Sequence, residues 1–274
     1  MSNVLTENDL EILIATKDRS SLDFLERMFP FEHFSNFHLI IINQSQESTL
    51  VSDFEKVKVF NSKEKGLSKS RNLAIKNASK KICLITDDDV VFESRFEKVV
   101  LEAFAEHDKA SIITFNHRRS GSETSEKKES RSFRHDLNSI WKVSSIEIAF
   151  RLDEIRKKKI CFDERFGLGS FFETAEEFLF LRSALEQKME IFFYPKLIVS
   201  HPQESSGRNE GSDQLLFART ALFYKLKGNY AYIWLLKYLF FLYRNHFINS
   251  SDFKEKFKTG LAGIQKYQEL IKRK

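Results

Sequence analysis

The chain is poor in cysteine, and it lacks a secretory signal, an internal repeat and a long apolar run. Its 274 residues include only two cysteines, which excludes a disulfide framework, and we expect both Cys83 and Cys161 to be buried thiols. Residues 1–9 are polar and acidic rather than basic and then apolar. This start predicts no signal peptide and a cytoplasmic protein.

The excess of charge is also small, because Lys and Arg alternate with acids over much of the length and the net charge is +5. This balance suits an anionic ligand or an anionic membrane surface, and we expect no nucleic acid as a partner. The length and a hydrophobic content of 42% allow a full α/β core, or one large domain with a helical appendage.

Short apolar runs alternate with amphipathic segments, which is typical of βαβ units around a mainly parallel sheet. The predicted strands of the first half are residues 10–15, 38–42, 57–60, 81–86 and 110–115, and its predicted helices are 68–78 and 95–105. Residues 117–136 break the pattern and predict a mobile surface loop. Beyond them, the expected elements are a strand at 143–149, a helix at 174–188, strands at 191–194 and 197–200, and helices from Gln214 onward.

Three consecutive aspartates, Asp87, Asp88 and Asp89, follow the apolar run 82–86. Carboxylates at the end of a buried strand repel one another, and a bound cation would lower the free-energy cost of this repulsion. Oxygen ligands suit Mg²⁺ or Mn²⁺, which bridge one or two carboxylates to nucleotide phosphates, and ligands of open α/β sheets gather at this edge. The simpler interpretation is an Asp-rich turn that ends a strand.

A second acidic site, Glu176-Glu177, precedes an apolar stripe. Glu177 lies three residues after Thr174, a spacing that is typical of a capping box at a helix start. A carboxylate at a helix N-terminus near the mouth of the sheet can also serve as a general base. The two roles do not exclude each other, because a helix start fixes the carboxylate in place.

Several short motifs follow one another in a fixed order. They are Thr16-Lys17-Asp18-Arg19 after the first strand, residues 66–75, residues 85–90, residues 162–169, Glu176-Glu177 and residues 199–202. This order, over residues 8 to 205, resembles that of the family 2 glycosyltransferases. The resemblance implies a GT-A fold, which is an α/β, Rossmann-like fold with a mostly parallel central sheet flanked by helices. It also implies a nucleotide-sugar donor, a divalent metal and inversion at the anomeric carbon.

The same resemblance divides the chain. It implies a GT-A domain over residues 1–205, with a nucleotide-binding half at about 8–116 and an acceptor half at about 137–205. Residues 206–274 would form a helical C-terminal extension.

The resemblance also implies roles for single residues. Asp87 and Asp89 look like the ends of the family's Asp-x-Asp motif, with Asp89 the closer contact of a Mg²⁺ or Mn²⁺ ion and Asp87 nearer the ribose or sugar. His201 resembles a histidine that approaches the metal or the diphosphate, and its alternative is a histidine that closes a strand. Glu177 corresponds to the base that takes the acceptor proton, with Glu176 as the next candidate.

The nucleotide contacts implied by the resemblance lie in the first half of the chain. They are Thr16, Asp18, Arg19, Asn43, Arg71, Asp87 and Asp88. Many relatives carry an aspartate that pairs with uracil where this chain has Asn43, and an amide presents a donor as well as an acceptor. This departure leaves the identity of the nucleotide open. UDP-sugars remain the first choice, and GDP- and dTDP-sugars are the alternatives.

The segment 230–247 is strongly apolar, but its apolar core over residues 230–243 is shorter than the roughly 20 residues that a spanning helix needs. With nearby Lys and Arg it could lie in the interface of an anionic membrane. Alternatively, the same face packs on the catalytic domain or on a second subunit in a homodimer.

These observations favour an inverting, metal-dependent glycosyltransferase of bacterial cell-surface polysaccharide synthesis. It would act in the cytoplasm, with a peripheral position on the inner face of the plasma membrane, on a glycan or lipid-linked acceptor. A nucleotidyltransferase acting on a sugar phosphate is the first alternative, but it should carry a Gly-rich loop near its N-terminus, and residues 15–21 contain no glycine. The second alternative is a non-catalytic interaction subunit with a GT-A fold, which predicts no metal-dependent nucleotide binding.

Overall fold

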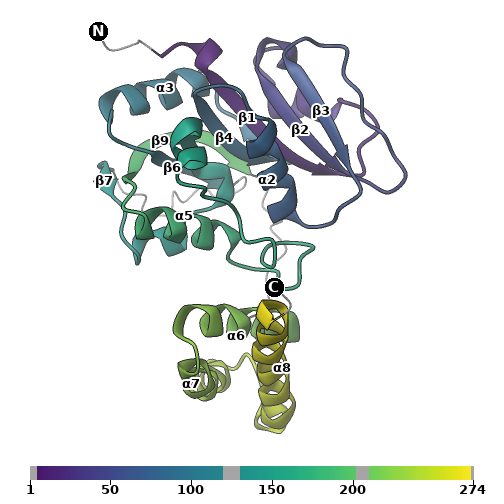
Figure 1. Cartoon of the computed structure of the whole chain (residues 1–274), viewed down its shortest axis with the longest axis vertical. Coiled ribbons are helices and arrows are strands. Elements are labelled where there is room, and N and C mark those ends of the chain that lie inside the picture. Colours follow the sequence, from purple (N-terminus) through teal and green to yellow (C-terminus); the bar gives the residue numbers. More distant parts are fainter. Residues whose placement is uncertain (1–4, 120–129, 202–209, 273–274) are drawn as a thin grey trace. The chain divides into compact units, whose positions relative to one another are not determined.

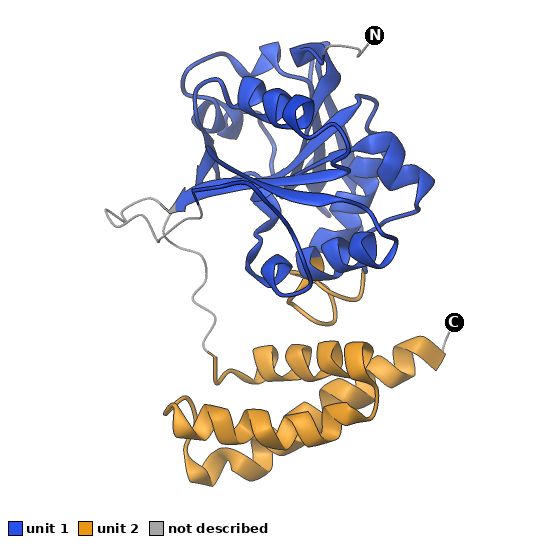
Figure 2. Cartoon of the chain, turned by 90° about the vertical axis from the view of Figure 1, so that its left-hand side faces the viewer, with its two compact units in different colours: residues 1–163, 177–203 blue, residues 164–176, 204–274 orange. Residues whose placement is uncertain are grey.

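The computed structural model describes residues 5–119, 130–201 and 210–272, and the chain divides into two compact units. Unit 1 comprises residues 1–163 and 177–203, and unit 2 comprises residues 164–176 and 204–274 (Figure 2). The assignment of residues 164–176 to the helical unit was not predicted from the sequence.

Unit 1 contains a sheet of nine strands among the described residues (Figure 1). The strands are β1 (Leu10–Lys17), β2 (Leu39–Gln44), β3 (Val57–Ser62), β4 (Ile82–Asp87), β5 (Val91–Phe92), β6 (Ile112–Arg119), β7 (Phe133–Arg134), β8 (Ile148–Arg151) and β9 (Ile191–His201). Their order is β3-β2-β1-β4-β8-β6-β9-β5, and β7 pairs with β9. Strands β1 to β4 are parallel, β8 runs antiparallel between β4 and β6, and β6 is parallel to β9.

The helices of unit 1 connect these strands. They are α1 (Phe24–Met28), α2 (Leu67–Asn77), α3 (Phe96–Glu106), α4 (Leu152–Lys157) and α5 (Glu176–Glu186), whose first residue belongs to unit 2. Short 3-10 turns occur at Glu7–Asp9 (η1), Phe34–Asn36 (η2), Ser139–Lys142 (η3) and Ser145–Glu147 (η4). This architecture confirms the predicted α/β fold class.

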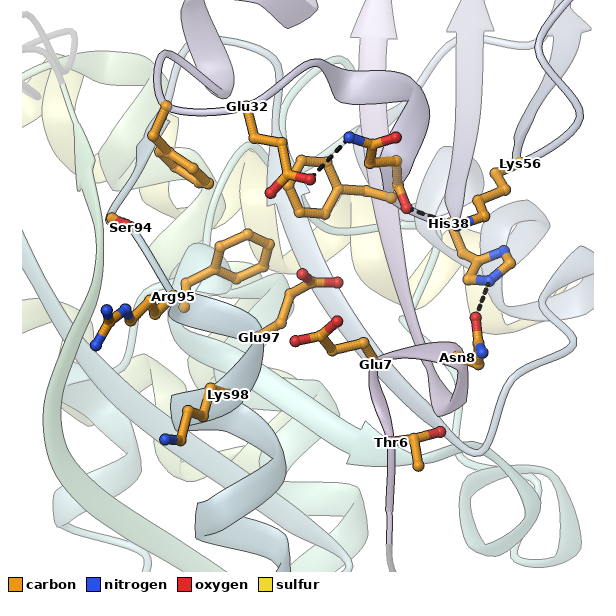
Figure 3. Close-up of a pocket in the computed structure, with 14 residues that line it drawn as sticks. Thr6, Glu7, Asn8, Glu32, His38, Lys56, Ser94, Arg95, Glu97 and Lys98 are labelled. Atoms are coloured by element: carbon orange, nitrogen blue, oxygen red, sulfur yellow. Dashed lines mark hydrogen bonds between the residues drawn. The ribbon is translucent and has the colours of Figure 1, made fainter.

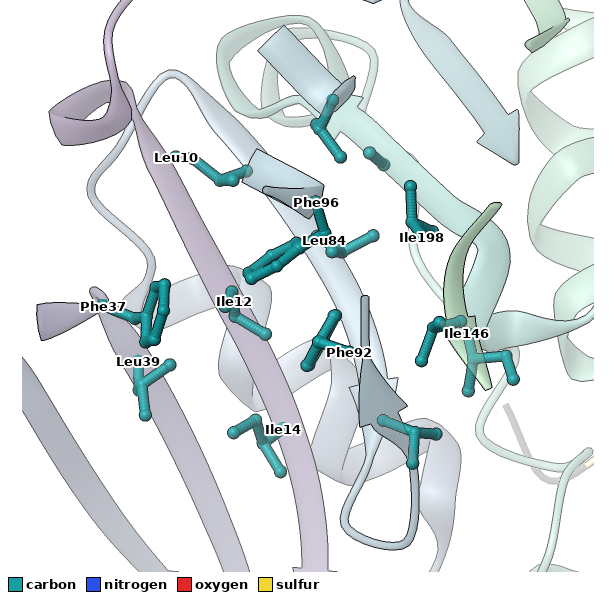
Figure 4. Packing of buried hydrophobic residues seen from close by; sticks show 14 of the residues in the cluster. Leu10, Ile12, Ile14, Phe37, Leu39, Leu84, Phe92, Phe96, Ile146 and Ile198 are labelled. Atoms are coloured by element: carbon teal, nitrogen blue, oxygen red, sulfur yellow. The ribbon is translucent and has the colours of Figure 1, made fainter. Parts of the chain in front are cut away.

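The central strands are buried along nearly their whole length, as expected for parallel strands covered on both faces. Figure 4 shows Ile12, Leu39 and Leu84 from adjacent strands packed together with phenylalanines outside the sheet. Phe29 stacks on Phe37 with ring centroids 4.6 Å apart. The many phenylalanines of the sequence thus supply large apolar contacts to this core.

Several predicted elements differ from the structure. The strand predicted at 143–149 begins only at Ile148, because residues 145–147 form a 3-10 turn. The two strands predicted over 191–200 are one strand, β9, whose pairing with β6 shifts register along its length. Within the predicted loop 117–136, the ends belong to β6 and β7, and residues 120–129 lie outside the described residues.

The two cysteines also differ from expectation. Cys83 is a buried free thiol in β4, as predicted. Cys161 is an exposed free thiol, so its predicted burial was wrong. The reason is local: Cys161 lies in the loop after α4, where its neighbours Ile160 and Phe162 point inward.

Unit 2 is a helical bundle, which confirms the helical C-terminal region predicted from the sequence. Its helices are α6 (Asp213–Lys227), α7 (Tyr230–Arg244) and α8 (Phe253–Lys272), with a 3-10 turn at Ser250–Asp252 (η5). A Cβ atom at Gly263 of α8 would clash with the backbone of Phe217, so glycine permits the close approach of α6 and α8. Loop 164–176 joins this bundle through Phe172, whose ring packs against Phe217 and Tyr267.

Candidate active site

The carboxyl ends of the parallel strands carry a row of polar side chains. Thr16 of β1 lies opposite Asn43 of β2, and Asn43 lies opposite Asn61 of β3. Asp87 of β4 is in register with the residue before Thr16, so Asp88 follows at the level of Thr16. Residues distant in sequence therefore meet at the edge where open α/β sheets bind ligands.

The side chain of Asn43 holds the turn that follows β1. Its Oδ1 accepts a hydrogen bond from the Arg19 N–H at 3.1 Å, and its Nδ2 donates to the Arg19 carbonyl at 2.9 Å and to Asn61 Oδ1 at 3.1 Å. Asn43 is fully buried, so both amide donors are used inside the protein. Asn43 thus positions the turn that carries Arg19, and its contact with the nucleotide stays a prediction.

The start of α2 is fixed by β2 in a similar way. The Gln44 side chain donates to the Gly66 carbonyl at 2.9 Å and accepts from the Gly66 N–H at 3.2 Å. Gly66 lies directly before α2 with φ at 122°, a conformation that favours glycine. These contacts fix the start of the helix whose fifth residue, Arg71, reaches the aspartates.

Asp87, the last residue of β4, is paired with buried Arg71. An Nη atom of Arg71 donates to Asp87 Oδ1 at 3.0 Å, and the guanidinium carbon lies 5.5 Å from the ring centroid of Phe162. The Asn72 side chain donates to the Phe162 carbonyl at 3.0 Å and accepts from its N–H at 2.8 Å. The motif at 66–75 and the start of the motif at 162–169 are thus brought together with the aspartates.

Asp88 is held from the first βα turn. Its Oδ2 accepts hydrogen bonds from Arg19 Nε at 2.8 Å and from Thr16 Oγ1 at 2.5 Å. Asp18 lies apart from this network: its side chain is largely exposed, its φ is 53°, and it pairs with Lys17 at 3.5 Å. A contact between Asp18 and the nucleotide stays a prediction.

Asp89 faces His201 at the end of β9, with Oδ2 and Nε2 3.3 Å apart. Partial burial raises the pKa of the Asp89 carboxyl above its usual range; His201 opposes the shift, and Asp87 and Asp88 add to it. The charges of Asp87 and Asp88 are offset by the permanent guanidinium charges of Arg71 and Arg19, whereas Asp89 pairs with an imidazole. Asp89 is therefore the carboxylate whose charge a cation would best stabilise.

The donor set at this point fits a Mg²⁺ or Mn²⁺ ion that takes its remaining ligands from phosphate and water. Such ions often use only one or two protein carboxylates. Within residues 5–119, 130–201 and 210–272, no group of three or more His, Cys, Asp or Glu side chains is arranged to hold a metal by itself. Asp89, with Asp87 and His201 beside it, would hold the ion when the nucleotide is also bound.

The acidic pair lies in the first turn of α5. The helix begins at Glu176, which is buried, and Glu177 follows in a half-buried position. The predicted helix start at Thr174 was two residues early, because Ala175 has φ at 60° and interrupts the helical conformation. A non-glycine residue in this region costs about 1–2 kcal/mol, and such strain tends to occur at functional sites.

One aromatic residue that packs on the helix of the acidic pair was missed in the sequence. Trp141, in η3, stacks on Phe178 of α5 with ring centroids 3.6 Å apart, and 53% of Trp141 is exposed. Phe178 directly follows Glu177 in the sequence. The only signal that could have indicated Trp141 is an isolated tryptophan in a polar segment, which is too weak to assign it to the site.

A separate polar cavity of about 800 Å³ lies at the opposite edge of the sheet, near the amino ends of β1 and β2. Figure 3 shows Glu7, Glu32 and Glu97 among its lining residues. Burial raises the pKa of Glu97 to about 7, and the charges of Glu7 and Glu32 add to the shift. None of the predicted site residues lines this cavity.

The sequence matches the model of glycosyl transferase family 2 over residues 19–187. This match spans more than half of the chain, and the chain belongs to this family. It is accordingly a nucleotide-sugar-dependent glycosyltransferase, as the order of the motifs predicted. Neither the nucleotidyltransferase nor the non-catalytic alternative is favoured by this match. A comparison with curated protein sequences found no match.

Solved structures with a similar fold include Staphylococcus aureus TarS. Residues 1–349 of TarS in complex with UDP-GlcNAc are 15% identical over 94% of this chain and 81% of that chain, with a TM-score of 0.59. The complex of TarS with UDP gives 14% identity, 93% and 80% coverage, and a TM-score of 0.57. At this identity the likeness shows a shared fold, which confirms the predicted GT-A class.

Proposed function

We propose that the protein transfers a sugar, with inversion, from a UDP-sugar to a hydroxyl group of a glycan or a lipid-linked acceptor. The observation that carries this proposal is the aspartate cluster at the carboxyl end of β4, where each carboxylate has a different partner. Support for UDP comes from TarS, which has the same fold and whose structures contain UDP and UDP-GlcNAc.

In the proposed site, different residues bind the leaving group and activate the acceptor. Asp87 and Asp88 are positioned by Arg71 and Arg19, which suits contacts with the ribose and the sugar. Asp89, with His201, would hold a Mg²⁺ or Mn²⁺ ion, which would supply positive charge to stabilise the departing diphosphate. The ion pairs with Arg71 and Arg19 hold Asp87 and Asp88 in fixed positions before the donor binds.

Glu177 is the proposed general base, with Glu176 as the alternative. Inversion requires a base on the face of the sugar opposite the leaving group, where it removes the acceptor proton. Two features support Glu177: it is half-buried rather than buried like Glu176, and the first turn of α5 favours a carboxylate. Trp141, which stacks on Phe178 of the same helix, offers a flat apolar surface against which the C–H face of a sugar ring can pack.

We also propose that the protein acts in the cytoplasm, on the inner face of the plasma membrane, in the synthesis of bacterial cell-surface polysaccharide. The two free thiols, one of them exposed, fit a reducing compartment. In the peripheral position, the apolar and aromatic helix α7 with its basic residues would face the membrane.

A donor screen tests the proposed reaction. The full chain is incubated with UDP-, GDP- and dTDP-sugars in the presence of Mn²⁺, and release of the nucleoside diphosphate is measured. We expect turnover that is highest with one UDP-sugar and is abolished by EDTA. Turnover that EDTA leaves unchanged would remove the metal from the proposal, and release of nucleoside monophosphate would indicate a different bond cleavage.

A further inference from the structure

Helix α7 of unit 2 carries two apolar stripes on different sides. The inner stripe is buried in the helical bundle and consists of Ala231, Leu235, Tyr238, Leu239 and Leu242. The outer stripe is exposed and consists of Ile233, Leu236, Phe240 and Tyr243. Its spacing of three, four and three residues keeps these side chains on one line along the helix.

The outer stripe is large for a surface that faces water. Leu236 is 57% exposed and Phe240 is 60% exposed, and Tyr230, Tyr232 and Phe241 add further exposed rings on the same helix. A contiguous apolar surface of this kind marks an interaction site more often than a solvated face. The inner stripe already supplies the contacts that hold α7 in the bundle, so the outer stripe is not needed for that purpose.

The charges around the outer stripe identify its partner. Between Asp213 and Asp252 the sequence contains no acidic residue, although it contains Arg219, Lys225, Lys227, Lys237 and Arg244. Lys237 and Arg244 are exposed and each directly follows a residue of the outer stripe. A second copy of the same surface would bring like charges together, which costs free energy, whereas an anionic bilayer offers both an apolar interior and negative charge.

We infer that the outer stripe of α7 binds the surface of an anionic membrane, with the helix lying in the plane of the interface. The aromatic and aliphatic side chains enter the boundary between headgroups and acyl chains, and Lys237 and Arg244 contact anionic headgroups. None of the described helices is long and apolar enough to span a bilayer. This inference deepens the peripheral position proposed above and does not rest on the transfer reaction.

The structure also shows which residues of the apolar segment should be tested. Trp234 stacks between Phe223 and Tyr238, and it packs against the buried cluster of the bundle. A Trp234 substitution would therefore disturb the core together with the surface. Leu236 and Phe240 are the appropriate pair, because both belong to the outer stripe.

The test is sedimentation of the full chain with vesicles of phosphatidylcholine alone or with added phosphatidylglycerol, without donor or acceptor. We expect binding only to the anionic vesicles, weakened by salt. Leu236→Ser with Phe240→Ser should reduce the affinity at least tenfold, because the apolar contacts are lost. Lys237→Gln with Arg244→Gln should reduce it about 30-fold, the scale expected for two basic residues near an anionic surface. Val51→Ser, which removes an exposed apolar side chain from unit 1, serves as the matched control and should bind normally.

Several outcomes would overturn the inference. The unsubstituted chain could bind neither vesicle, or bind both equally. Light scattering could show a dimer that the substitutions Leu236→Ser and Phe240→Ser dissociate while vesicle binding stays unchanged. That result would show that a second copy of the chain covers this face. A large drop in melting temperature with unchanged sedimentation would show that the face is internal. The Lys237→Gln and Arg244→Gln variant changes only exposed side chains, so it keeps the test informative if the apolar variant fails to fold. Because no substrate is present, failure of the transfer reaction would not affect these results.

Discussion

The side-chain amide of Asn43 bonds both the N–H and the carbonyl of Arg19, and Arg19 in turn bonds Asp88. A buried side chain at the end of β2 thereby fixes the backbone of the turn that positions one aspartate of the site. This relationship explains why an amide suits position 43. The amide of Asn43 stabilises the turn because it accepts a hydrogen bond from the Arg19 N–H and donates one to the Arg19 carbonyl.

The first prediction concerns Asn43→Asp. The carboxylate has no donor for the Arg19 carbonyl or for Asn61 Oδ1, so two hydrogen bonds are lost and a charge is buried. We expect a loss of roughly 2–4 kcal/mol in the free energy of unfolding, measured in urea, and weaker UDP binding by the folded protein. Asn229→Asp, which changes an exposed amide directly before α7 that makes no side-chain cap bond, is the control and should have little effect. If Asn43→Asp instead strengthened UDP binding with unchanged stability, position 43 would contact the base directly.

The sequence predicted the α/β class and most strands of the first half, because short apolar runs that end in polar residues and alternate with amphipathic segments are typical of βαβ units. It also indicated the aspartates, because a charged triplet after a buried strand is conspicuous. It could not predict that Asn43, Asn61 and Gln44 act within the protein, because strand register decides which polar residues meet. The same holds for Trp141: its stacking on Phe178 depends on packing that no local pattern encodes.

The second prediction is that Glu177→Gln keeps donor binding but lowers the rate of transfer by about 10² or more, the usual scale for the loss of a general base. Glu186→Gln, at the other end of α5, is the matched control and should transfer normally. The measurements are transfer kinetics and a melting curve for each variant. Normal transfer by a less stable Glu177→Gln variant would mean that the residue is structural, and Glu176 would then be tested.

The third prediction concerns Trp141. Because its exposed ring stacks on Phe178, the residue that follows the proposed base, Trp141→Ala should raise the KM for the acceptor or the sugar about tenfold while the affinity for UDP stays unchanged. Substrate titrations of the rate and a separate UDP titration distinguish these effects. Trp141→Phe should recover most of the activity, because it keeps an aromatic face. Equal KM values in Trp141→Ala and the unsubstituted protein would show that the ring only covers Phe178.

The fourth prediction is a pH dependence of stability that originates far from the site. Burial raises the pKa of Glu97 from 4.5 to about 7 in the folded protein, so the folded state holds a proton that the unfolded state has lost. The contribution of this proton is fully present below pH 4.5 and is lost as the pH rises through about 7. Melting curves should therefore shift upward from pH 7.5 to pH 5.5, and Glu97→Gln should reduce this shift. Glu102→Gln, on the same helix but exposed, should not change it.

The central claim is that Asp89 supports metal-dependent binding of the nucleotide, and calorimetric titration of UDP into the full chain with and without Mn²⁺ tests it most directly. We predict that Mn²⁺ tightens UDP binding and that Asp89→Asn removes most of this gain while the melting temperature is retained, because an amide is a poorer ligand than a carboxylate. The effect of Mn²⁺ should also fade as the pH falls, beginning above the usual range of an aspartate, because the pKa of Asp89 is raised. Asp108→Asn, an exposed acid after α3, should bind like the unsubstituted protein. An Asp89→Asn variant that keeps the full effect of Mn²⁺ on UDP affinity would contradict the account.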